Sequence, residues 1–552
     1  MIALYTFLKR AALSALLLSA LTIGMGCNKK LDLSPETALS DASFWKTPAD
    51  LLSACTTLYN SLPGMAANYQ DNYSDISFGA AANTVSDGSR IAPATAAEWA
   101  DNYTLIRRSN TILEKSAGVK GDEVLIKKAK GEASFFRAWA YFELVKRYGD
   151  VPLILRTFDI QDTLATAHRT PRAQVIKAIY SDLDFAAANC PDAAAQPAAE
   201  YGRITAGAAL AFKSRVALFE GTREKFFNYG TPTSDLTIAI DAAGKVMANA
   251  RYGLYQNASK PDSSYFYLFQ LTADGAANKE NILVRLYGQD MTNSISYTNV
   301  SRDLEQALIS PTRTMLDLYL YKDGLPIGKS LLQQEQTNTT SEFANRDPRA
   351  GITVFNRSLW YISGRYVPNF DFTKTGYKLA KWFKGTDWNN KRSFTDFAII
   401  RYAEVLLNYA EARYELNGSI TDDDLNLTIN RIRARNGAGA IAPLTNVFVN
   451  SNGLNMRDEI RRERSVELAF EGFRYWDLLR WKTAEVQLPA QVLGIKYFPA
   501  EMKITSPSLT TDGYLITQPA AKRAFNPAKD YLWPIPTSEL GYNPNMVQNP
   551  GW

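Results

Sequence analysis

The chain has 552 residues, of which 46% are hydrophobic and 12% aromatic, and its 61 Lys and Arg against 56 Asp and Glu give a formal net charge of +5. So much apolar material excludes an intrinsically disordered chain, and a charge so close to balance gives no indication of nucleic-acid binding. With a single His, His168, the chain cannot supply a metal site that needs two His ligands.

Residues 1–26 have the pattern of a secretion signal. Two basic residues at 9–10 precede an apolar run over 11–23, which is too short for the roughly 20 helical residues that span a bilayer. The small residues that lead into Cys27 resemble the lipobox of bacterial lipoproteins. We therefore predict cleavage before Cys27, a lipid on its thiol as the anchor, and a polar tether over 27–45. Ordinary secretion with a buried Cys27 is the alternative.

The body of the chain is predicted to be mostly helical. Over 125–148, apolar residues recur at spacings of three and four in two adjacent stripes, which is typical of a helix packed between neighbours. Gly149 and Pro152 predict its end. A series of such helices indicates stacked helix pairs. Similar patterns occur over 173–188, 205–220, 237–250 and 401–416.

Two acidic clusters have a structural and a functional interpretation. The helix predicted over 455–470 begins a ladder of carboxylates spaced four residues apart and interleaved with Arg, which favours ion pairing over general acid–base chemistry. Thr421 precedes three Asp, which favours a helix cap over a calcium loop because the Gly and Glu of that loop are missing. The ladder consists of Glu459, Glu463, Glu467 and Glu471, and the capped run of Asp422, Asp423 and Asp424.

No sequence motif indicates catalysis. The chain has no Walker A loop, no GxSxG elbow, no dinucleotide-binding glycine pattern and no CxxC. His168 is predicted to be a polar surface residue. Cys55 and Cys190 allow a disulfide, but two buried small side chains are the favoured alternative. We expect neither a metal nor a cofactor.

Four long stretches lack helical periodicity and are rich in small polar and aromatic residues. Loops of this length are commonly functional, so a helical scaffold with aromatic loops predicts a binding surface before it predicts an enzyme. The stretches are 64–98, 255–300, 325–398 and 485–530.

Several ordered segments resemble the SusD/RagB family of Bacteroidetes outer-membrane lipoproteins. They include GEASFFRAWAYFELVKRYGDVPLI (131–154), RYAEVLLNYAEARYELNG (401–418), RRERSVELAFEGFRYWDLLRW (461–481) and YLWPIPTSELGYNPNMVQNPGW (531–552). The resemblance implies a mainly α fold: a superhelix of tetratricopeptide-like helix pairs with long irregular loops that bear the ligand site. An N-terminal region over 46–300 and a C-terminal region over 301–552 are expected to pack as one body.

The resemblance also implies a role. Such proteins are lipid-anchored in the outer membrane, facing the cell exterior, and capture oligosaccharides for a SusC-like TonB-dependent transporter without catalysing a reaction. The tetratricopeptide-like face is the implied contact with the transporter. A protein of the same architecture that binds peptides or another nutrient is one alternative, and a lipid-anchored hydrolase with two carboxylates is another.

Candidate ligand contacts are aromatic and polar residues of the long loops. Flat rings stack on the CH faces of sugars, while polar side chains satisfy the hydroxyls. For each candidate the alternative is packing against a nearby helix, which we favour for Trp99 at its loop–helix junction. The candidates are Tyr69, Tyr73, Asp87, Arg90, Trp99, Tyr287, Tyr297, Trp360, Tyr361 and Trp388. We assign Trp139, Tyr402, Tyr409, Trp476 and Trp481 to packing.

Overall fold

The computed structural model describes residues 44–291, 295–368, 372–502 and 504–552. The predicted signal segment, Cys27 and most of the tether lie outside these residues. None of the described helices is long and apolar enough to cross a membrane. The first described residues, 44–47, lead into the first helix of the body.

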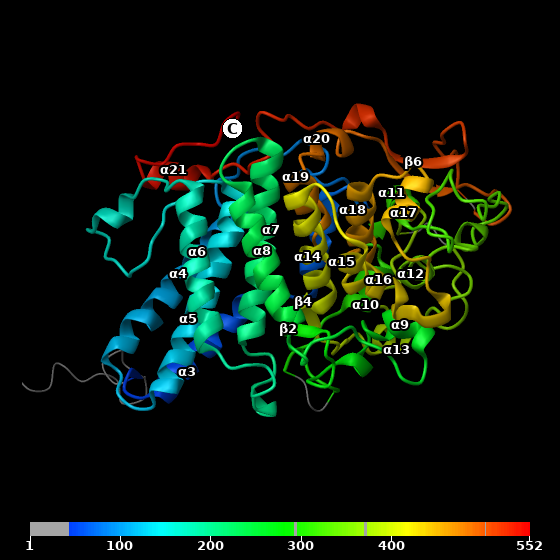
Figure 1. Ribbon diagram of the computed structural model, residues 1–552. Coiled ribbons are helices and arrows are strands. Elements are labelled where there is room, and N and C mark those ends of the chain that lie inside the picture. The colour runs from blue at the N-terminus through cyan, green and yellow to red at the C-terminus, as the bar shows by residue number, and fades with distance from the viewer. Residues whose placement is uncertain (1–43, 292–294, 369–371, 503) are drawn as a thin grey trace, which may run out of the picture.

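One side of the molecule is a stack of helices that pack in chain order (Figure 1). Each helix contacts the next, and the stack is closed by a helix from the C-terminal half that packs on the last two members. The C-terminal region therefore extends the helix stack, and the predicted boundary between 300 and 301 remains a prediction. The stack comprises α3 (Pro48–Thr56), α4 (Ala97–Lys115), α5 (Glu123–Tyr148), α6 (Arg172–Asn189), α7 (Ala206–Phe227), α8 (Pro232–Met247) and α14 (Tyr402–Asn417).

The predicted helices are present, with ends set by local chemistry. The side chain of Asp122 accepts hydrogen bonds from two backbone N–H groups and caps α5, and Gly149 ends this helix at a positive φ of 73°. The side chain of Thr421 accepts a hydrogen bond from the backbone N–H of Asp424, which confirms the predicted cap. The helix α7 ends at Phe227, seven residues beyond the predicted segment. It stops there because the next residue, Asn228, has the left-handed conformation.

The core of the stack combines aromatic rings with very small residues. The Trp139 ring of α5 stacks on Phe212 of α7 with centroids 4.7 Å apart, and Phe142 meets Phe219 edge-on at 5.5 Å. A Cβ added at Gly221 of α7 would lie 2.9 Å from the backbone nitrogen of Leu236 in α8. The small residues thus allow the close approach that the sequence predicts.

The other side of the molecule consists of loops with short helices and three antiparallel strand pairs (Figure 1). The pairs are β1 (Ser77–Phe78) with β3 (Ser310–Pro311), β2 (Asn281–Arg285) with β4 (Phe397–Arg401), and β5 (Val492–Lys496) with β6 (Tyr514–Gln518). The short helices of this side are α9 (Ser264–Tyr267), α10 (Val300–Glu305), α11 (Arg313–Leu318), α12 (Pro348–Thr353), α13 (Gly385–Asn390), α15 (Asp422–Leu427), α16 (Ile429–Arg433), α17 (Asn446–Ser451), α18 (Met456–Glu467), α19 (Arg474–Arg480) and α20 (Ala484–Gln487). The helix α21 (Thr537–Tyr542) lies instead at the helix-stack side, near α6 (Figure 1).

The carboxylate ladder of α18 pairs with arginines, which confirms the predicted ion pairing. Glu467 lies at the centre of this network and is fully buried. Its oxygens are 2.6 Å from Arg401, 2.6 Å from Arg435 and 2.9 Å from Arg349. Glu463 pairs with Arg349 and Arg433, and Glu471 with Arg401 and Lys381. The ladder therefore joins the loops to the C-terminal helices.

Cys55 and Cys190 are free and buried, as the favoured interpretation predicts. The Cys55 thiol donates a hydrogen bond to the carbonyl of Ala129 at 3.3 Å. A Cβ at Gly131 would lie 2.8 Å from the Cys190 sulfur, so this thiol fills the space beside α5. Burial raises the pKa of both thiols, which makes them unreactive packing groups.

Candidate functional site

The short helix α10 brings together aromatic residues that are far apart in the sequence. The Tyr69 hydroxyl, from the 3₁₀ helix η3 (Met65–Tyr73), donates a 2.6 Å hydrogen bond to the carboxylate of Asp303. The next residue back, Arg302, places its guanidinium 4.4 Å from the centre of the Trp388 ring. Its Nε also donates to the carbonyl of Trp388 at 3.0 Å, so α10 holds η3 on one side and α13 on the other.

Tyr297 lies beside this group and is open to solvent. Its side chain is 51% exposed, and the guanidinium of Arg392 is 4.7 Å from its ring centre. Backbone hydrogen bonds of 2.9 Å in both directions join Thr298 to Ser393 and hold the two segments together. Tyr297 therefore presents an aromatic ring to solvent, with the Arg392 guanidinium beside it.

Trp360 is the most exposed of the predicted tryptophans, at 64%. It occupies a turn closed by a backbone bridge to Arg365. This turn lies against the start of α13, because a Cβ at Gly385 would be 2.9 Å from the carbonyl oxygen of Tyr361. We call the set of Tyr297, Arg302, Trp360, Trp388 and Arg392 the α13 surface.

Two predicted residues near the α13 surface are covered by protein. Tyr287 is buried, and its hydroxyl accepts a hydrogen bond from the backbone N–H of Met65 at 3.0 Å. Tyr361 is half-buried and stacks on Phe383 with centroids 5.1 Å apart. Burial raises the pKa of Tyr361, as it does for Tyr69, where Asp303 adds to the effect. The hydroxyls of Tyr69 and Tyr361 are therefore neutral hydrogen-bonding groups at physiological pH.

The α13 surface contains a polar group that its own packing does not satisfy. The indole Nε1 of Trp388 is buried and makes no hydrogen bond with the described residues, and neither do the hydroxyls of Thr298 and Ser393. A buried donor without a partner costs roughly 1–3 kcal/mol. The residues here are thus not arranged for stability alone.

The remaining candidates lie elsewhere, under the C-terminal segment. Tyr73 packs edge-on against Tyr475 and Trp533, at 5.6 and 5.9 Å. The Arg90 guanidinium lies 4.7 Å from the Trp533 ring and 4.9 Å from the Trp552 ring. Both side chains tie an N-terminal loop to the C-terminal end and do not join the α13 surface.

Asp87 and Trp99 have local structural partners. The Asp87 carboxylate accepts hydrogen bonds from the backbone and hydroxyl of Ser89, which shapes its own turn. Trp99 is buried in α4 and packs edge-on against Tyr148 at 5.0 Å, as favoured for this residue. With its ring covered, Trp99 has too little open face to stack on a sugar.

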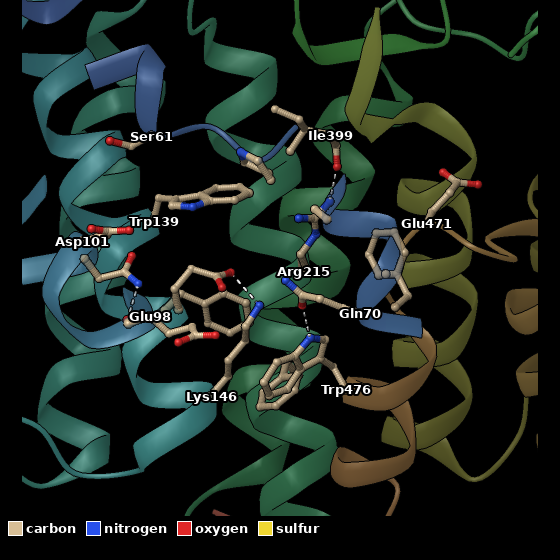
Figure 2. Close-up of a pocket in the computed structure, with 18 of the residues that line it drawn as sticks. Ser61, Gln70, Glu98, Asp101, Trp139, Lys146, Arg215, Ile399, Glu471 and Trp476 are labelled. Atoms are coloured by element: carbon tan, nitrogen blue, oxygen red, sulfur yellow. Dashed lines mark hydrogen bonds and ion pairs between the residues drawn. The ribbon is translucent and has the colours of Figure 1, made fainter. Parts of the chain in front are cut away.

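A cleft lies within the helix stack, and no sequence pattern predicted it. This cleft of about 590 Å³ is lined by α4, α5, α7, α19 and the segment 60–70 (Figure 2). Trp139 and Trp476, assigned to packing, are nearly buried yet line it. Its polar residues lie on helices, where their spacing resembles that of an ordinary solvated face, so no local signal identifies them.

The floor of the cleft is a charged pair beside an aromatic ring. The Lys146 ammonium lies 2.6 Å from the Glu143 carboxylate and 4.5 Å from the centre of the Trp476 ring. Burial lowers the pKa of Lys146 to about 8, against the opposing effect of Glu143. Burial also disfavours the charged Glu143, but Lys146 and Arg147 outweigh it and hold its pKa at about 2. Lys146 and Glu143 are therefore both ionised at neutral pH, and Arg147 shares the same carboxylate at 2.6 Å.

Comparison with protein families gives two matches that together span most of the chain. Residues 279–552 match the model described as SusD family. Residues 31–218 match the model described as starch-binding associating with outer membrane.

Individual relatives match along most of their length. SusD-like protein P2 of Formosa agariphila is 26% identical, with 96% of this chain and 97% of the relative covered. A SusD-like protein of Bacteroides ovatus is 23% identical over 82% of this chain and 79% of its own. A crystal structure of a SusD-like carbohydrate binding protein from Bacteroides fragilis has a TM-score of 0.74 and 26% identity, covering 91% of this chain and all of that one. A laminarin binding SusD-like protein shares the fold, with a TM-score of 0.59, 21% identity and coverage of 92% of this chain and all of that one.

Proposed function

We propose that this chain, which belongs to the SusD family, captures oligosaccharides at the cell surface and delivers them to a SusC-like TonB-dependent transporter. The family consists of carbohydrate-binding proteins associated with the outer membrane, not of enzymes. Membership confirms the predicted fold and the predicted binding role. The ligand, the transporter and the exterior location belong to the proposal.

The α13 surface is the observation that carries glycan binding. Tyr297 and Trp360 present open ring faces, and the guanidinium groups of Arg302 and Arg392 lie beside aromatic rings. Stacking on the CH faces of sugar units needs open rings, and the hydroxyls need donors and acceptors at their edges. Both are present within one set of loops that the α10 contacts hold in place. The Bacteroides fragilis relative described as carbohydrate binding supports the same ligand class.

The membrane anchor and the transporter contact rest on other parts of the chain. The signal pattern before Cys27 supports a lipid on that residue, which would attach the protein without spanning the membrane. The helix stack of α4–α8 is the proposed contact with the transporter, by the family resemblance. It leaves the α13 surface free to hold cargo at the same time.

Glycan retention in affinity gels tests the site. We expect Y297A together with W360A to weaken retention about 10- to 100-fold, because each stacked ring contributes roughly 0.5–1.5 kcal/mol. The matched control is Tyr542→Ala, which removes a ring that is 80% exposed on α21, away from the α13 surface. Unchanged retention in the double variant would refute the site, and release of reducing ends by pure protein would refute a role in binding alone. Retention of peptides but of no glycan would favour the alternative nutrient class.

A further inference from the structure

A single segment of the chain separates the cleft of Figure 2 from the α13 surface. Within η3, Tyr69 points to α10 and bonds Asp303, whereas its neighbour Gln70 accepts a hydrogen bond from the Trp476 indole in the cleft at 3.3 Å (Figure 2). One wall of the cleft is therefore the back of the element that supports the proposed glycan surface. The support of the α13 surface and the cleft therefore share this short segment of chain.

The cleft runs inward from an exposed rim to a buried floor. Ser61 and Asp101 are exposed at the rim, whereas Trp139, Phe142 and Trp476 are nearly buried at the floor. The inner lining belongs to core helices, so a ligand enters the cleft from its rim. The end of a chain is the part of a polymer that this shape admits.

Several polar groups of the cleft are left unused by the fold. The carboxylates of Glu98 and Asp101 lie one helical turn apart on α4, so they share a face, and both line the cleft (Figure 2). Neither carboxylate makes a hydrogen bond or a close ion pair with the described residues, although Glu98 is near enough to Arg147 to help raise the pKa of that guanidinium. The hydroxyl of Ser61 and the amide nitrogen of Gln70 likewise make no hydrogen bond with the described residues. They offer acceptors and donors above a floor of nearly buried apolar side chains, which is chemistry that a sugar unit can use.

The charges that line the cleft balance. Its acids are Glu98, Asp101, Glu143, Glu471 and Asp477, and its bases are Arg108, Lys146, Arg215, Arg464 and Arg480. Most of these are already in ion pairs, such as that of Arg215 with Glu404 at 2.6 Å. A charged ligand would bring an uncompensated charge into a partly desolvated site, which is costly, whereas a neutral one would not.

We propose that the cleft receives the end of a neutral glycan whose inner units lie on the α13 surface, and this inference rests on the proposed function. Glu98 and Asp101 accept hydrogen bonds from the hydroxyls of the end unit, and the nearly buried Trp139 lies at the floor beneath it. The site would thereby select neutral chain ends and reject those that end in uronic acids.

Calorimetric titration of the full mature chain tests this inference with defined probes. The probes are linear neutral hexasaccharides of β-1,3-glucose, α-1,4-glucose, β-1,4-mannose and β-1,4-xylose, and for each hexose ligand that binds, the same chain oxidised to a uronic acid at C6 of its terminal unit. We expect the neutral chain to bind at least about tenfold more tightly than its oxidised form. The E98Q and D101N double variant should weaken neutral binding about tenfold and reduce the discrimination.

The variants separate this inference from the function on which it rests. D241N, on an exposed carboxylate of α8, is the matched control and should change nothing. If E98Q with D101N leaves every affinity unchanged while Y297A with W360A still weakens binding, the cleft inference is wrong and the proposed function stands. If the oxidised and neutral ends bind equally, the inference is also wrong. If no neutral probe binds, the inference and glycan binding by the α13 surface fail for this class of glycan. Thermal melts of the variants check folding, which Glu98 and Asp101 do not support through any described bond.

Discussion

The helix stack and the loop-rich side of the molecule both contain buried ion pairs, but they differ in how their segments approach one another. In the stack, α7 and α8 approach so closely at Gly221 that an added Cβ would lie 2.9 Å from the backbone nitrogen of Leu236. On the loop-rich side, Arg401 at the end of β4 is 1% exposed and bonds Glu467 and Glu471 of the C-terminal half. Loops have no periodic apolar face to bury, so directional contacts between buried charges define how they sit on the helices. Such pairs specify an arrangement more than they add to stability.

The largest effect should follow from breaking the charged network. Glu467→Gln leaves three buried arginines without their shared carboxylate, and the free energy of unfolding should fall by about 3–5 kcal/mol. Urea denaturation measures this loss. Asp241→Asn breaks an exposed pair with Lys245 on the helix stack and should change stability by less than about 0.5 kcal/mol. Equal losses in the two variants would contradict the distinction between the buried charge network of the loop-rich side and the exposed pair on the helix stack.

A buried carboxyl at the junction of the two sides should make stability depend on pH. Burial raises the pKa of Asp71 from 3.8 to about 7, against the backbone N–H groups of Gly472 and Arg474 that bond it. Between these pKa values the folded state holds a proton that the unfolded state has lost. Stability should therefore fall as pH rises from about 4 to 7, by up to about 4 kcal/mol.

Asp71→Asn tests the assignment of this pH dependence. Asn cannot ionise, so urea midpoints measured from pH 4.5 to 8 should decline less in the variant than in the parent chain. Parallel curves would show that another group is responsible.

A smaller effect should follow from filling the space between two helices of the stack. Gly221→Ala places a methyl group 2.9 Å from the backbone of Leu236, and the resulting shift should cost about 1–3 kcal/mol despite the better helix propensity of Ala. Gly541→Ala on α21 meets no atom within 4 Å and should gain up to about 1 kcal/mol. Calorimetric melting temperatures that move the same way would contradict the close packing.

The smallest effect on stability should come from the α13 surface. Trp360 is 64% exposed, so Trp360→Ala should change the free energy of unfolding by less than about 0.5 kcal/mol. Its effect should instead be seen in glycan retention. A large loss of stability with unchanged retention would place this ring among the structural residues.

Local patterns predicted much of the helical framework. The residues over 125–148 occur as α5 almost to the residue, because apolar spacing, an Asp cap and a terminal Gly act within a few turns of chain. The ion-pair interpretation of the carboxylate ladder is confirmed for a similar reason, since Glu and Arg at helical spacing on a face without apolar residues need partners. The arginines that pair with Glu467, however, come from separate segments that no local pattern connects.

The binding residues were predicted less completely. Loop composition suggested the neighbourhood of Tyr297, Trp360 and Trp388, and the structure places these near α13. Composition could not separate them from Tyr73 and Arg90, which pack under the C-terminal end. The same kinds of residue occur in both places, and only their partners differ.

The single histidine of the sequence was enough to exclude a metal site with two or more His ligands. Motifs in order along the chain identified the family and its helical scaffold. These features depend on residue type and on spacing within a few helical turns. Tertiary structure alone decided which rings remain open and which polar groups lack partners. Tyr69 meets Asp303 across 234 positions of sequence, and Gln70 beside it lines a cleft built from several helices, because loop closure depends on all the contacts of the fold at once.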